Sequence, residues 1–379
     1  MTPEPELGSI VKHFGKVKDP RINRTKLHEL LDIIIIAICG VICGADNWVD
    51  IELFGKAKID WLKTFLKLPN GIPSHDTFGR VFAALNPQEF ESSFMEWVQA
   101  INQLTQGQVI AIDGKQLRGS RDSGVGKNAI YMVSAWATEN QLVLGQRKVD
   151  EKSNEITAIP KLLKLLEIKG CIVTVDAIGT QTKIAKTIIE QEGDYILAVK
   201  ENQGRLYEDI HDLFEDNQRF NYAGIPHSYA KWVNKDHGRI EIRQCWTISD
   251  PEYLANIRDL KRWQGLRTLV MILSERHIGD EVEVQDRYFI TSLESNAEKI
   301  LRAKRSYWGI ENCLHWELDI AFNEDHSRVR KDNAPHNFAI LRHMALNLLK
   351  QEKTAKGGIK AKRLQCGWNM DYLLKVLAG

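Results

Sequence analysis

The sequence has few cysteines, and those it has are scattered. Among the six there is no CxxC pair, and no histidine stands nearby at zinc-ligand spacing, which excludes a fold built on zinc or on disulfides. Long apolar runs are also missing: the most apolar stretch, residues 33–45, is far shorter than the roughly 20 residues of a membrane-spanning helix. The first residues lack the basic and apolar regions of a secretion signal. We therefore expect a cytoplasmic protein without a membrane partner.

Net charge is nearly absent as well. The chain has 51 Lys and Arg against 50 Asp and Glu, a formal net charge of +1, so total charge gives no sign of a polyanionic partner. The distribution is uneven, because residues 299–379 carry fifteen Lys and Arg but eight Asp and Glu. If nucleic acid is the partner, phosphate contacts are expected in this basic stretch and in local basic clusters.

Residues 1–105 are predicted to form an all-helical N-terminal domain. Apolar residues recur at helical spacing over 27–43, 48–66 and 88–104. Ser74 is placed to cap a further helix in the same region.

Residues 106–350 change to a mixed α/β pattern. Strands are predicted at QVIAID, AIYMVSAWA, QLVLGQRKV, CIVTVD and DYILAVK, with helices over 155–166 and 180–191. Three strands, a helix, a strand, a helix and a strand is the order of a ribonuclease-H-like core with a mixed sheet. Short β segments predict a β-rich insertion at about 217–296, followed by helices over 297–319 and 333–350. Residues 351–379 are expected to be a basic C-terminal tail.

Two acids stand where predicted strands end. Asp113 directly follows VIAI, and Asp176 directly follows IVTV. For either acid alone, an ordinary strand-end turn is as good an explanation as a functional site. Two carboxylates on strands of one sheet favour a site, since they invite a hard divalent ion such as Mg²⁺, which prefers carboxylate oxygens.

A third carboxylate is expected from the helix predicted after the insertion. This helix offers Glu311, Glu317 and Asp319. Glu311 shares a helix face with His315 at i, i+4, and Lys304 lies on that face nearer the start of the helix. The apolar neighbours of Glu311 favour it over the other two acids.

Nine sequence blocks, in order along nearly the whole chain, match one known family. They are LHELLDIIIIAICGVICGADNW, GIPSHDTFGRVF, IAIDGKQLRGS, KSNEI, VTVDAIGTQ, DYILAVKENQ, HGRIEIR, YWGIENCLHWELDIAFNEDHSRVR and NFAILRHMALNLLK. In these blocks the sequence resembles the bacterial H-repeat-associated insertion-sequence transposases of the DDE superfamily. The resemblance implies a helical N-terminal domain, a ribonuclease-H-like catalytic domain with a β insertion before its last acid, and Mg²⁺-dependent DNA strand cutting and joining.

Carried over residue by residue, the resemblance places the catalytic and metal-binding triad at Asp113, Asp176 and Glu311. It implies two Mg²⁺ ions, for which Mn²⁺ is a substitute, in an in-line displacement at phosphorus. The implied partners are double-stranded DNA, as terminal inverted repeats and as target, bound by a dimer or larger assembly. The chain departs from the superfamily pattern at Tyr307, where Arg is usual, and at Leu318, where Lys is usual.

Basic residues near the strand ends and near the third acid are candidates for DNA contact, with a solvated surface side chain as the alternative for each. They are Lys115, Arg118, Lys152, Lys200, His237, Arg239, Arg243, Arg302, Arg305, Arg328 and Arg330.

Three functions fit the sequence. The favoured one is an active transposase of an insertion sequence. The second is a catalytically silent transposase relic that keeps the fold and binds DNA. The third is an unrelated metal-dependent nuclease, or a glycosidase that uses a carboxylate pair without metal. The presence of all three acids favours the first function over the second.

Overall fold

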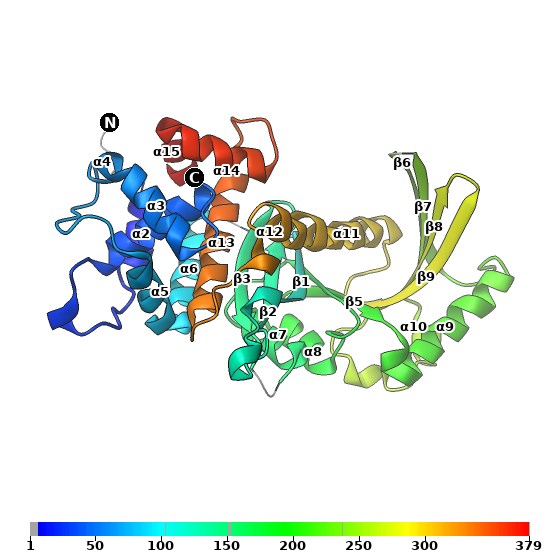
Figure 1. Ribbon diagram of the computed structural model, residues 1–379. Helices are drawn as coiled ribbons and strands as arrows, with labels where there is room; N and C mark the ends of the chain where they lie inside the picture. Colours follow the sequence, from blue (N-terminus) through cyan, green and yellow to red (C-terminus); the bar gives the residue numbers. More distant parts are fainter. Residues whose placement is uncertain (1–6, 103, 151–152, 237, 379) are drawn as a thin grey trace.

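A single mixed β-sheet runs through the computed structural model, which describes residues 7–102, 104–150, 153–236 and 238–378 (Figure 1). The strands are β1 (Val109–Gln116), β2 (Tyr131–Ala137), β3 (Leu142–Lys148), β4 (Ile172–Val175), β5 (Asp194–Val199), β6 (His227–Asp236), β7 (Arg239–Ile248), β8 (Thr268–Ile278) and β9 (Glu281–Thr291). Their order in the sheet is β3-β2-β1-β4-β5-β9-β8-β7-β6. β1, β4 and β5 are mutually parallel, and all other neighbours are antiparallel.

Helices from both ends of the described chain pack together beside the β3 edge of the sheet (Figure 1). From the N-terminal side come α1 (Gly8–Phe14), α2 (Leu30–Ile42), α3 (Trp48–Ala57), α4 (Ile59–Leu62), α5 (His75–Ala84) and α6 (Pro87–Ile101). From the C-terminal side come α13 (Ala334–Gln351), α14 (Ile359–Trp368) and α15 (Met370–Ala378). α2 lies at the centre, with every residue but Leu31 buried, and it packs on α13. The predicted helical N-terminal region is confirmed, and C-terminal helices complete it.

The basic stretch after residue 350 is therefore not a free tail. Arg363 of α14 is buried, and its guanidinium donates hydrogen bonds to Val41 O at 2.8 Å and to Asp46 Oδ1 at 3.1 Å. Lys362 is also buried and donates to Leu349 O at 3.0 Å. These two cations hold helices together, and so they are withdrawn from any contact with nucleic acid.

Helices cover both faces of the first five strands (Figure 1). α7 (Glu155–Leu163) and α8 (Thr182–Glu190) lie on one face, where Ile112 of β1 shares a core with Ile159 and Ile184. α11 (Ala297–Gly309) lies on the other face, where Val109 of β1 packs in a separate core with Ile300. The alternation of side chains along a strand explains why one strand feeds both cores. Among the described residues, no helix is long and apolar enough to cross a membrane.

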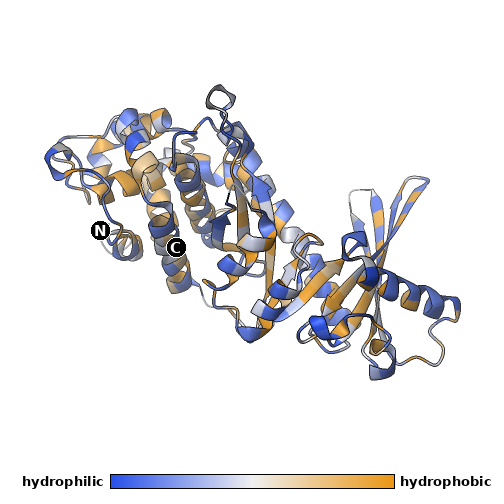
Figure 2. Ribbon diagram, turned by 90° about the horizontal axis from the view of Figure 1, so that it is seen from below, coloured by the Kyte–Doolittle hydropathy of each residue, from blue (hydrophilic) through white to orange (hydrophobic). Residues whose placement is uncertain are grey.

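The strands β6 to β9 form an antiparallel meander that extends the sheet from β5. Figure 2 shows polar and apolar residues alternating along these strands. α9 (Gly204–Arg219) packs on β9, and α10 (Pro251–Leu254) follows β7. Strand β6 and helix α9 are additions to the predicted elements: β6 is mostly polar, and α9 buries a narrow stripe of Leu206, Ile210 and Phe214.

The mixed α/β class predicted from the sequence is confirmed, with local differences. Ser74 accepts a hydrogen bond from Thr77 N and so caps α5 as expected. The helix predicted over 297–319 is interrupted, because a π-helical turn (Ile310–His315) joins α11 to α12 (Trp316–Ile320). The 3₁₀ turns are Asn23–Thr25, Arg118–Ser120, Ser123–Val125, Glu201–Gln203, Leu260–Arg262 and Glu324–His326.

Candidate active site

Two acids lie side by side on neighbouring strands. The parallel register pairs Ile112 of β1 with Val175 of β4, so the next residues along the two strands are Asp113 and Asp176. Their side chains leave the sheet on the face covered by α11, and both residues are partly buried. Asp176 Oδ1 accepts a hydrogen bond from Gly179 N at 3.0 Å, which fixes its carboxylate at the start of the following loop.

A third acid reaches the same place from the helix above the sheet. Glu311 lies in the π-helical turn, and it lines a cavity of about 830 Å³ together with Asp113 and Asp176. Lys304 and Tyr307 of α11 line this cavity too. A π turn inserted in an α-helix is frequent at functional sites, since it redirects the side chains that follow it.

The acids repel one another electrostatically. Burial, and after it the negative charges of Asp176, Glu155 and Glu311, raise the pKa of Asp113 to about 7, although its carboxylate accepts a backbone hydrogen bond from Gly114. A carboxyl with so high a pKa binds a proton near neutral pH unless a cation replaces it. The donor set of carboxylate oxygens fits a hard divalent cation such as Mg²⁺ or Mn²⁺.

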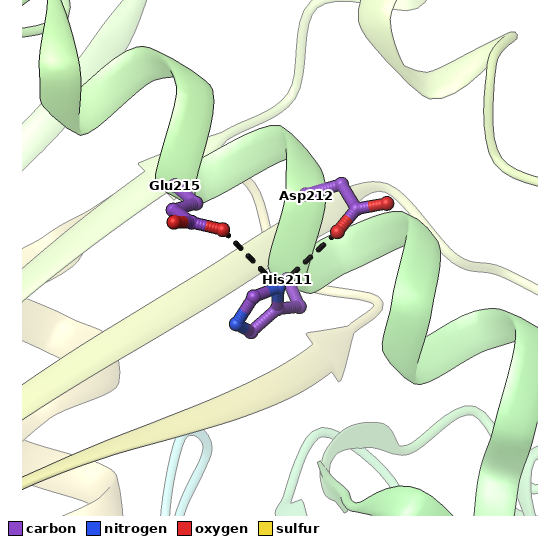
Figure 3. A group of neighbouring side chains, drawn as sticks. All are labelled: His211, Asp212 and Glu215. Carbon is purple, nitrogen blue, oxygen red and sulfur yellow. Dashed lines mark hydrogen bonds and ion pairs between the residues drawn. The ribbon is translucent and has the colours of Figure 1, made fainter.

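The carboxylates of the three acids are spread apart in the cavity. Their ligand oxygens do not all lie within 4.8 Å of one another; in the described part of the chain, the only group of three or more candidate ligands that meets this limit is on α9. That group is His211, Asp212 and Glu215 (Figure 3). His211 Nδ1 lies 3.2 Å from Asp212 Oδ1 and 3.8 Å from Glu215 Oε2, all on one solvated turn, so these are ordinary surface ion-pair contacts.

Glu155 lies near Asp113 without lining the cavity, and the sequence predicted no role for it. It begins α7 within the KSNEI block, and a Cβ added at Gly114 would meet Glu155 Oε1 at 2.5 Å. The carboxylate therefore lies directly against the backbone beside Asp113. Burial raises the pKa of Glu155, and the charge of Asp176 adds to this effect, while a hydrogen bond from Tyr131 opposes it. The available sequence signal was the position of Glu155 at a helix start just after β3.

His315 supports Asp113 from the helix. Its Nδ1 lies 3.4 Å from Asp113 Oδ2. Burial and the positive charge of Lys115 lower the pKa of His315 to about 4, so its imidazole is neutral near pH 7. The predicted shared face of Glu311 and His315 thus brings one residue to the cavity and the other to Asp113.

Lys115 has a structural place that differs from its predicted contact with DNA. Its ammonium is largely buried, with the side chain 13% exposed, and it forms ion pairs with Asp319, with Glu324 Oε2 at 3.0 Å and with Asp325 Oδ1 at 3.9 Å. Arg342 binds the other oxygen of Glu324 at 3.5 Å. Lys115 is saturated by these carboxylates and is not free to bind a phosphate, and its ion pair takes up Asp319, one alternative third acid.

The other predicted DNA contacts fall in different places. Lys200 lines the cavity, whereas Arg239, Arg243 and Arg305 line an adjoining groove of about 620 Å³. Four more lie elsewhere in the described chain. Arg328 and Arg330 line a third hollow near α5, Arg118 pairs with Asp325 at 3.6 Å, and Arg302 pairs with Glu298 at 3.2 Å on the exposed side of α11. Lys152 and His237 lie outside the described residues.

A mixed sheet with carboxylates converging at the ends of its parallel strands, in an open cavity, defines the class: a protein with a candidate divalent-metal site of the kind that acts on phosphate esters. Comparison with known proteins narrows it. Residues 11–98 match the family "DDE_Tnp_1-associated", and residues 104–348 match the family "Transposase DDE domain". The chain belongs to the DDE transposase family.

Known transposases are similar in sequence to this chain over nearly its full length. The chain is 41% identical over 378 residues to the "H repeat-associated putative transposase YhhI" of Escherichia coli K12, covering 99% of each chain. It is 42% identical over 376 residues to the "Putative transposase YncI" of Escherichia coli O157:H7, covering 98% of this chain and 94% of that one. A solved structure, a piggyBac transposase synaptic complex with hairpin DNA, aligns with a TM-score of 0.42 and 12% identity over 99% of this chain and 78% of that chain, too distant to support a conclusion.

Proposed function

We propose that this protein is the transposase of an insertion sequence, which cleaves DNA strands at the element ends and joins them to target DNA by in-line displacement at phosphorus. The observation that carries the proposal is the meeting of Asp113, Asp176 and Glu311 in one cavity, in a chain of the DDE transposase family. The strand order β3-β2-β1-β4-β5, with α7 and α8 as the connecting helices, supports a ribonuclease-H-like core. The meander β6–β9 then corresponds to the insertion at about 217–296.

Asp113, Asp176 and Glu311 are the proposed ligands of two divalent ions. When bound, such ions supply the charge that activates the attacking oxygen and stabilises the leaving oxygen of a phosphodiester. The protein holds Asp113 and Asp176 on adjacent strands and presents Glu311 from the facing helix, so the three carboxylates keep their geometry before DNA arrives. His315 Nδ1 lies 3.4 Å from Asp113 Oδ2, and its proposed role is to position this carboxylate.

DNA is the proposed partner along two connected hollows. The cavity and the adjoining groove share Gln285, Arg287 and Trp308, so a strand that passes the acids continues along the face of the meander. Lys200, Arg239, Arg243 and Arg305 remain the proposed phosphate contacts on this path, while Lys115 is removed from the set. Because an element has two ends that must be cut together, we propose a dimer or larger assembly on DNA.

The test is cleavage of a supercoiled plasmid that carries both ends of the element, in Mg²⁺ or Mn²⁺. The unmodified protein should nick at the element ends, and Asp113→Ala, Asp176→Ala and Glu311→Ala should each abolish nicking. Glu317→Ala is the matched control, since it removes an acid of the same helical segment outside the proposed ligand set. Binding of the ends without any cutting by the unmodified protein would instead support a DNA-binding relic.

A further inference from the structure

A lysine lies beside the acids at the floor of the cavity. The sheet register pairs Val175 of β4 with Leu197 of β5, so Asp176, the residue after β4, comes next to Ala198. Ala198 pairs with Phe289 of β9, so Asp176, Ala198 and Phe289 form a row across the sheet. Lys304 reaches down from α11 onto this row: its Nζ lies 4.7 Å from the centre of the Phe289 ring and 3.3 Å from Thr174 Oγ1. The small side chain of Ala198 leaves room for the ammonium.

The positive charge of Lys304 has no close carboxylate partner among the described residues. In the described part of the chain, no carboxylate oxygen lies within 4.0 Å of Lys304 Nζ, and the faces of Phe289 and Tyr307 are its main contacts, the latter at 4.4 Å. Burial, and after it the positive charge of Arg287, lower the pKa of Lys304 to about 7, although Asp176 opposes the change. Of the three protons of an ammonium, the hydrogen bond to Thr174 uses one. Within the described residues the other two protons have no hydrogen-bond acceptor, and Lys304 lines the cavity together with the acids.

With two divalent ions bound at the acids, the charge balance of the site favours an anion beside Lys304. Asp113, Asp176 and Glu311, the proposed ligands, carry three negative charges when ionised, and two divalent ions neutralise these in full. Lys304 then remains as a partly buried cation beside a site whose negative charge has been cancelled. A buried charge needs a partner of opposite sign. A phosphodiester group carries one negative charge and would supply that partner.

We propose that Lys304 Nζ binds a non-bridging oxygen of the scissile phosphate. This inference rests on the proposed function, because it names the residue that holds the substrate group at the acids. The other cations of the cavity are less suited: Lys200 is exposed at the rim, and the Arg287 guanidinium donates to Gln285 Oε1 at 2.6 Å and lies over Trp308.

The test is a double-mutant cycle between the lysine and one phosphate. Affinity is measured for a duplex of the element end, and for the same duplex with a neutral methylphosphonate at the scissile position, with Ca²⁺ in place of Mg²⁺. For the unmodified protein, the methylphosphonate should weaken binding about tenfold, in the range typical of a hydrogen bond between ionised groups. Lys304→Met should lose about the same factor on the phosphate duplex and nearly nothing more on the methylphosphonate duplex. Lys304→Arg should retain part of the discrimination, and Lys299→Met, on the exposed face of α11, should retain all of it.

Equal losses for Lys304→Met on the two duplexes would overturn the inference, since they would show a structural role instead. If Lys304→Met fails to fold, acetylation of the unmodified protein provides the same comparison: the phosphate duplex should protect Lys304 from the reagent, and the methylphosphonate duplex should not. Equal protection by both duplexes would also overturn it. Failure of the unmodified protein to bind or cut any element end would refute the proposed function itself, and so the two failures are distinct.

Discussion

Replacing Lys115 with methionine tests whether this residue supports the fold or binds DNA. Methionine keeps the length and the apolar stem of lysine but removes the charge. In the protein, the lost charge faces Glu324, whose side chain is 1% exposed, and Asp319 and Asp325, whose side chains are 32% and 22% exposed. Lys115 stands two residues after Asp113, and its ammonium joins the end of β1 to the segment that follows α12.

The expected loss of stability comes mainly from Glu324. Breaking a buried ion pair from one side costs about 3–5 kcal/mol, because the remaining charge stays buried. Asp319 and Asp325 keep contact with water and contribute little, and Arg342 still binds Glu324 at 3.5 Å. We therefore expect a decrease near the lower end, about 3 kcal/mol, in the free energy of unfolding. A surface lysine that only contacts DNA would change it by less than about 0.5 kcal/mol.

Urea denaturation followed by circular dichroism measures this difference. Lys200→Met is the matched control, since Lys200 is exposed at the cavity rim and should leave the unfolding midpoint unchanged. The double variant Lys115→Met with Glu324→Gln should recover part of the loss, because it removes both members of the pair. The reasoning fails if Lys115→Met unfolds at the same urea concentration as the unmodified protein.

Three further changes have expected outcomes. The pKa of Asp113 is raised to about 7 in the folded protein, so the metal-free fold binds this proton more tightly than the unfolded chain does. The free energy of unfolding should therefore fall as pH rises from about 4 to about 7, and Glu155→Gln should reduce that fall. Urea midpoints measured with EDTA across this pH range test both expectations. Gly114→Ala should displace Glu155 and cost about 1–3 kcal/mol in the same assay, because the added methyl group would lie 2.5 Å from Glu155 Oε1. Arg363→Lys should lower the free energy of unfolding by about 2 kcal/mol, because a single ammonium cannot satisfy both Val41 O and the other acceptors of the guanidinium. A stability equal to that of the unmodified protein would show that the planar set of guanidinium donors is not needed.

The strands that carry the first two acids could be predicted from the sequence because their signal is local. VIAI and IVTV are short, apolar and β-branched, and each ends in an acid at the point where the chain leaves the core. Their place in one sheet was predicted from the order of the elements, although β2, β3 and α7 lie between them in the chain. For the same reason the helix that carries Glu311 was visible as a periodic pattern, although the π turn within it was not, since a single inserted residue leaves the composition unchanged.

The roles of the basic residues could not be predicted, because they depend on partners far away in the chain. Lys115 meets Asp319 across 204 positions, and its spacing to Asp113 is equally suited to a phosphate contact. Lys304 and Thr174 are separated by 130 positions. Glu155 stands near Asp113 only because α7, which packs on β2 and β3, begins beside Gly114. A sequence pattern indicates the helix or strand period and the face on which a residue lies, whereas these contacts are set by tertiary packing.

The interleaving of the two chain ends has a consequence for synthesis on the ribosome. Helix α2 is apolar on nearly all sides, and α13, its principal cover, is made about 300 residues later. Until α13 is made, the nascent chain exposes the apolar surface of α2, which favours aggregation or binding by a chaperone. A gene copy cut short before α13 would leave α2 uncovered, so we expect its product to be removed by proteases rather than to persist as a folded protein.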